Sequence, residues 1–105
     1  MSTGNLSLLA QKIPEVWRSR RLAVVGNASI KLIRMGGEGI PDECHPEFDE
    51  LLVVIEGEME LVVDQQVVRL KTGDYYAIPR GAIHRVSAAS YGTLLLVDTD
   101  IANSK

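Results

Sequence analysis

Two histidines are the residues of this 105-residue chain best suited to chemistry, and each can be placed near acidic side chains. His45 lies between Glu43 and Glu50, whereas His84 is far along the chain. Two neutral imidazoles and one carboxylate are the facial ligand set of non-haem Fe(II) sites. His45, Glu50 and His84 are therefore candidate metal ligands, and Glu43 is a candidate fourth ligand. A second carboxylate would make the site neutral with a divalent ion and weaken it as a Lewis acid.

Extended strands are the elements expected to bring these four side chains together. Residues two apart in a strand share a face, so Glu43 and His45 are expected to point together into a barrel. Glu50 is expected to open the next strand, and His84 follows a turn at 79–81 that brings a distant strand alongside. Glu43 has a second role open to it: a carboxylate beside a metal in a partly apolar cavity can serve as a general base. It is therefore also the candidate catalytic residue.

Short apolar runs separated by turn residues predict strands over most of the chain. They are expected at residues 22–25, 29–35, 50–56, 58–64, 67–70, 75–78, 83–87 and 93–98, with Gly57 turning the chain between two of them. This pattern predicts an all-β, antiparallel sandwich or barrel over about residues 22–98. The expected core residues are Ile30, Leu32, Leu52, Val54, Leu61, Val63, Leu70, Ile78 and Val86.

One short helix is expected before the strands. Leu6, Leu9 and Ile13 have helical spacing, and Pro14 ends the helix at Ile13. The whole chain is expected to form one domain, residues 1–105, with tails at 1–5 and 100–105.

Composition limits the classes of partner. The net charge of −3 argues against a nucleic acid or an anionic membrane surface. No apolar run is long enough to span a bilayer, and the first residues do not resemble a secretory leader. The single cysteine, Cys44, rules out an intrachain disulfide framework. These features favour the cytoplasm.

Two stretches of the chain resemble the two motifs of the cupin family. The first motif is matched in spacing by Gly37, His45, Glu50 and Gly57, and the second by Gly73, Pro79, Gly81 and His84. Glu43 stands in the slot of the first motif's first histidine, and Ala88 stands in the slot of the second motif's asparagine. A second alignment starts the first motif at Gly39 and places Glu47 in the second histidine slot, but it leaves leucine in the acid slot. In layout the chain is most similar to small, single-domain cupins described as mannose-6-phosphate-isomerase-like.

The resemblance implies a jelly-roll barrel that holds a divalent ion, with Fe, Mn, Zn and Ni all open, and a small-molecule ligand inside. Two functions follow as hypotheses: a metal-dependent isomerase or dioxygenase acting on a small polar molecule, or a non-catalytic binding or sensing module. A metal-free cupin, in which both histidines bond to Glu50, is the alternative to metal binding. The runs 51–55 and 94–97 are apolar on both strand faces. An antiparallel strand with one solvated face should alternate, so these runs predict a homodimer.

Overall fold

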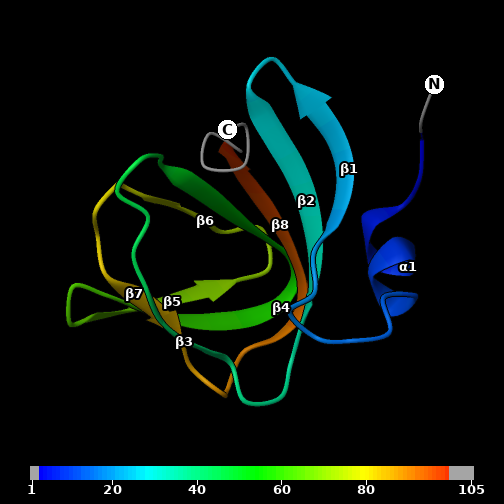
Figure 1. The fold of residues 1–105 in the computed structure, drawn as a ribbon. Coiled ribbons are helices and arrows are strands. Elements are labelled where there is room, and N and C mark those ends of the chain that lie inside the picture. The colour runs from blue at the N-terminus through cyan, green and yellow to red at the C-terminus, as the bar shows by residue number, and fades with distance from the viewer. Residues whose placement is uncertain (1–2, 100–105) are drawn as a thin grey trace.

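The computed structural model describes residues 3–99. Of the expected tails at residues 1–5 and 100–105, residues 1–2 and 100–105 lie outside that part of the chain. Figure 1 shows one short helix followed by strands that curl into a barrel. The elements are α1 (Leu6–Gln11), β1 (Arg20–Val25), β2 (Ala28–Met35), β3 (Ile40–Glu43), β4 (Glu50–Val63), β5 (Gln66–Lys71), β6 (Tyr75–Ile78), β7 (His84–Val86) and β8 (Tyr91–Thr99).

The strands form one antiparallel sheet in the order β1-β2-β8-β4-β7-β3, and β5 and β6 also pair with β4. The sheet curls without closing, because β1 and β3 are left as edges of this order. The predicted all-β antiparallel fold with one short N-terminal helix is confirmed. No helix among residues 3–99 is long and apolar enough to cross a membrane.

Strand β4 is longer than the sequence pattern indicated. It runs unbroken from Glu50 to Val63, so the predicted turn at Gly57 is wrong. Gly57 pairs directly with Gly92 of β8. Both have left-handed φ angles, 102° and 108°, and an added Cβ at either would overlap a backbone carbonyl of the other strand. The missing side chains let two backbones approach closely while β4 bends, and β4 thereby pairs with β6 and β8 at one end and with β5 and β7 at the other.

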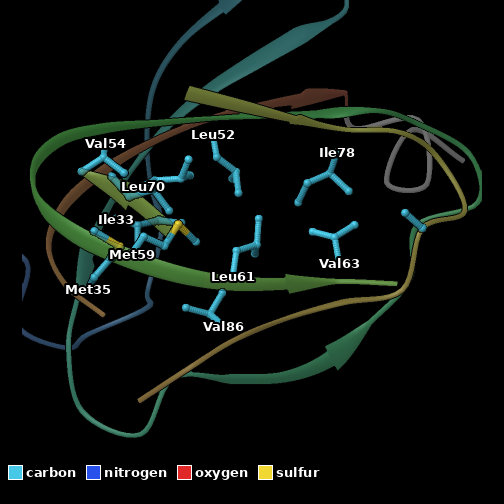
Figure 2. Packing of buried hydrophobic residues seen from close by; sticks show 12 residues of the cluster. Ile33, Met35, Leu52, Val54, Met59, Leu61, Val63, Leu70, Ile78 and Val86 are labelled. Atoms are coloured by element: carbon cyan, nitrogen blue, oxygen red, sulfur yellow. The ribbon is translucent and has the colours of Figure 1, made fainter. Parts of the chain in front are cut away.

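The barrel interior holds the main hydrophobic core (Figure 2). Its buried members are Ile33, Met35, Leu52, Val54, Met59, Leu61, Val63, Leu70, Ile78, Ala82, Val86 and Leu94. Of the two predicted core residues on β2, Leu32 is buried as predicted and Ile30 is not. Ile30 is only half-buried, and Leu32 is buried in a separate cluster with Ala10 and Ile13 of the N-terminal segment. The alternation of β2 therefore runs one residue out of step with the prediction, with Ile33 and Met35 facing inward.

The N-terminal segment lies against the outside of the sheet. Asn5 caps α1 by accepting a hydrogen bond from the Leu8 N–H, and Ala10 and Ile13 pack on Leu32 of β2. Beyond the helix, Arg34 donates to the carbonyls of Ile13 and Pro14, each at 2.9 Å. These contacts direct the chain around the sheet edge toward the barrel interior.

Trp17 also attaches the N-terminal segment to the sheet. Its backbone has a left-handed φ of 66°, which L side chains rarely adopt. Its backbone N–H donates to the Arg34 carbonyl at 2.8 Å, and its indole Nε1–H donates to the Gly36 carbonyl at 2.6 Å. Two hydrogen bonds to β2 and the residue after it therefore hold the ring in place.

The paired glycines generate a stability prediction. Substituting Gly92→Ala should lower the free energy of unfolding by more than about 3 kcal/mol, because the new Cβ meets backbone that cannot yield. Gly73→Ala is the matched control: its φ is also left-handed, at 91°, but nothing lies within 4 Å of the added Cβ. It should cost only the backbone strain, about 1–2 kcal/mol. Equal losses for the two variants in urea unfolding would contradict the close approach as the cause.

Candidate metal centre

Strand pairing brings Glu43 and His84 together. Glu43, the last residue of β3, is the register partner of His84, the first residue of β7. On its other side, His84 pairs with Val63 at the far end of β4. His84 is thus held between two strands, and its side chain is buried with 6% exposure.

The four predicted site residues meet at this place. Glu43, His45 and His84 can each offer one ligand atom within 4.8 Å of the others. Glu50, the first residue of β4, points its Oε1 at both rings, 3.5 Å from Nε2 of His45 and 3.3 Å from Nε2 of His84. Two ligand atoms about 2.1 Å from one ion and at right angles lie about 3 Å apart, so the spacings between Glu50 and the two histidines suit a shared ion.

The orientation of His84 is set by its other ring nitrogen. Nδ1 lies 3.1 Å from the carbonyl oxygen of Ala82, which can only accept a hydrogen bond. Nδ1 therefore carries the proton, and in the neutral ring Nε2 presents a lone pair. That lone pair faces a carboxylate oxygen of Glu50. Two acceptors in this arrangement repel unless a cation, either a proton or a metal ion, lies between them.

Burial makes the carboxylate of Glu50 costly to ionise. Its side chain is 9% exposed, and loss of hydration raises the pKa of Glu50 above its ordinary value, while His45 and His84 act in the opposite direction. A positive charge beside Glu50 would offset that cost. The electrostatics of the site therefore favour a cation at the point where Glu50 and the two imidazoles meet.

His45 reaches the site from a loop. Strand β3 ends at Glu43, so the expectation that Glu43 and His45 share one strand face is wrong. The ring of His45 is stacked on Phe48, with centroids 4.8 Å apart, and its backbone carbonyl accepts a hydrogen bond from Gly81 at 3.0 Å. The loop's own contacts, and not strand alternation, aim this imidazole.

Two acidic residues that the sequence did not single out for a structural role anchor the chain around His84. Asp49 accepts a hydrogen bond from the Arg80 backbone N–H at 2.8 Å, which lowers the pKa of Asp49 and ties the His45 loop to the turn before His84. Asp64 accepts from the Ile83 N–H at 3.0 Å. Aspartates in loops are common, so residue type alone gives no signal for these roles.

A cavity of about 160 Å³ adjoins the candidate ligands. Three of its lining side chains are polar: Glu43, Glu50 and His84. The others are Trp17, Ile33, Ile40, Leu52, Met59, Leu61, Ile78, Val86, Leu94 and Leu96. Trp17 differs from the other members in coming from the N-terminal segment and not from a strand. The site therefore combines a cluster of candidate ligands with an apolar chamber.

Comparison with known proteins agrees with this fold. The uncharacterized protein YdbB of Bacillus subtilis (strain 168) is 32% identical over 82 residues, which cover 77% of this chain and 72% of that protein. A cupin-2 domain protein from Shewanella frigidimarina superposes with a TM-score of 0.83 at 23% identity, covering 90% of this chain and 92% of its own.

A protein from Ralstonia eutropha JMP134, provisionally assigned as a mannose-6-phosphate isomerase, superposes with a TM-score of 0.74 at 21% identity, covering 94% of this chain and 98% of its own. The family model described as "Cupin domain" matches residues 32–100, which include every candidate ligand. The chain therefore belongs to the cupin family.

Proposed function

We propose that this protein is a metal-dependent enzyme that acts on a small molecule held inside the barrel. His45, Glu50 and His84 are proposed to hold one divalent ion. The observation that carries the proposal is the arrangement at His84: its Nδ1 is committed to a carbonyl, so its Nε2 lone pair faces the buried carboxylate of Glu50 at 3.3 Å. A bound metal ion would satisfy both groups together, and a proton shared between them is the metal-free alternative.

The donor set favours a hard or borderline metal. Two imidazoles with one or two carboxylates suit Fe(II) or Mn(II), and they suit Zn(II) or Ni(II) better than Cu(I), which prefers sulfur. Three or four protein ligands do not saturate Fe(II) or Mn(II). When bound, such an ion supplies Lewis-acid chemistry toward an oxygen-bearing ligand.

The metal assignment predicts the effect of removing a ligand. His84→Ala should weaken metal affinity by more than about 100-fold, which exceeds the 10- to 100-fold loss typical of an outer-shell residue. His45→Ala, at a side chain that is 30% exposed, should do the same with less risk to folding. Glu43→His should retain the site and tighten it for softer metals.

Glu47→Gln is the control, because Glu47 is an exposed acid of the same loop. Metal content by elemental analysis of untagged protein and affinity by calorimetry give the readout, and circular dichroism checks the fold. Unchanged metal content in both histidine variants would show that the ligand assignment is wrong.

Glu43 is proposed as the proton-transferring residue or as a fourth ligand. It lines the cavity, is exposed, and lies opposite His84 on the neighbouring strand. A carboxylate in this place could accept a proton from carbon next to a carbonyl, as in isomerisation of sugars or keto acids. The alternative reaction class, oxygen activation at reduced iron, would not need this proton transfer.

The two reaction classes and the two roles of Glu43 predict different measurements. An isomerase should exchange a substrate proton with solvent under anaerobic conditions, and a dioxygenase should consume O₂ in the presence of reduced iron. If Glu43 is the base, Glu43→Gln should retain metal and lose solvent exchange; if it is a ligand, the variant should lose metal. Metal-loaded protein that binds a sugar, keto acid or diketone but shows neither reaction would instead be a binding or sensing module.

We also propose that the protein is a cytoplasmic homodimer. Leu51 pairs with Val97 and Val53 pairs with Leu95, and all four side chains are only half-buried in the single chain. They form a continuous apolar strip on β4 and β8, which a second copy could cover. The free, exposed thiol of Cys44 suits a reducing compartment.

The dimer proposal predicts a mass of two chains by light scattering at micromolar concentration. Leu95→Glu should shift the mass to one chain, because it places a charge in the strip. Leu8→Glu is the control: Leu8 is 59% exposed on α1 and should leave the mass unchanged. A single-chain mass for the unsubstituted protein would contradict the proposal.

A further inference from the structure

The polar lining of the cavity beside the candidate ligands is confined to one cluster of side chains. Its polar lining consists of Glu43, Glu50 and His84, which lie together at the proposed metal site. Every other described lining residue is apolar, and none of the described lining residues carries a positive charge. A ligand that fills the chamber therefore meets oxygen and nitrogen atoms at one end only.

Glu43, the only exposed residue among the described lining residues, adds negative charge where the chamber meets solvent. Five acidic residues and no lysine or arginine lie between positions 42 and 50, the segment that supplies three of the four candidate ligands. The nearby arginines face acids: Arg80 Nε is 3.5 Å from Asp49, and Arg85 Nη1 is 3.9 Å from Asp42. A phosphate or a carboxylate placed away from the metal would be repelled by these acids outside the chamber. Inside the chamber it would lose its hydration without gaining a polar partner.

Size imposes a second limit. A cavity of about 150 Å³ lined by aliphatic and aromatic side chains accommodates a benzene molecule. The chamber here has a similar volume, about 160 Å³. A hexose phosphate is much larger than benzene, so its charged group would lie either against apolar walls or outside the chamber, on the side of the exposed carboxylate of Glu43.

We propose that the chamber selects an uncharged molecule with a compact apolar body and one oxygen-bearing end, and that it excludes phosphorylated sugars. This inference rests on the proposed function for the role of the oxygen-bearing end, which would lie at the metal. The apolar body would lie among Ile33, Leu61, Leu94 and the ring of Trp17. It replaces the small polar substrate expected from the sequence, and the sugars and keto acids named above, with a molecule that is polar at a single end.

A matched ligand series tests the proposal on the manganese-loaded protein. 1-Hydroxybutan-2-one, dihydroxyacetone and dihydroxyacetone phosphate share one hydroxyketone head and carry a methyl, a hydroxyl or a phosphate at the other end. Calorimetry gives their affinities. Fluorescence gives a local readout, because Trp17 is the chain's only tryptophan and lines the chamber.

The methyl compound should bind about tenfold more tightly than the hydroxyl compound, since a buried hydroxyl would lack a partner. The phosphate should show no saturable binding. Each methylene added to the apolar end should tighten binding about fourfold until the chamber is full. Phosphate binding as tight as that of the methyl compound, or no binding of any of the three to metal-loaded protein, would overturn the proposal.

A designed variant reverses the predicted preference. Ile40 lines the chamber but is only half-buried, so a longer polar side chain there need not disrupt the core. Ile40→Lys should give the phosphate compound at least tenfold tighter binding than Ile40→Met, the uncharged control of similar length. No difference between the two variants would show that missing positive charge is not what excludes the phosphate.

Metal content measured on the same samples separates this inference from the proposed function. If the protein takes up no metal yet keeps the order methyl, hydroxyl, phosphate, the metal-dependent function fails and the selectivity of the chamber stands. If it takes up metal and prefers the phosphate, the selectivity fails and the metal site stands.

Discussion

The close approach of two backbones at Gly57 and Gly92 is the constraint on which the rest of the molecule depends. It lets β4 bend while it remains paired with β8, so one strand serves both ends of the barrel. Glu50 opens β4 beside β6, and Val63 closes it beside His84. The position of the candidate site therefore depends on a glycine pair that lies outside the site and provides no reactive group.

The same bend encloses charge in an apolar setting. Glu50 is buried by the curling of β4, and its carboxylate is left facing two imidazoles with little water around it. A buried carboxylate is tolerated when a cation lies beside it. The anchoring hydrogen bonds of Asp49 and Asp64 hold the flanking turns, so the ring of His84 is fixed before any cation arrives.

The candidate ligands and the fold class could be predicted because both depend on spacing along the chain. Apolar runs between turn residues indicated the short strands, and the two histidines lie at the positions of the two motifs. The turn predicted at Gly57 is wrong because glycine occurs both in tight turns and where two strands approach closely, and only the partner strand distinguishes the two cases. Leu32 is buried as predicted, but in a second apolar cluster that α1 forms on the outside of β2, which the strand pattern alone does not reveal. His45 could not be placed by strand alternation, since its loop is held by contacts with residues near 81.

Trp17 lies in the N-terminal segment, before the first strand, yet it forms part of the chamber wall. Its backbone N–H bonds to the Arg34 carbonyl and its indole N–H bonds to the Gly36 carbonyl, so the residue is held in place without belonging to a strand. Replacement by a smaller or larger ring would change the shape of the chamber while the strands and the candidate ligands stayed in register. Related proteins with the same barrel could therefore accept different molecules through changes in the N-terminal segment alone, while the strands and the candidate ligands are retained.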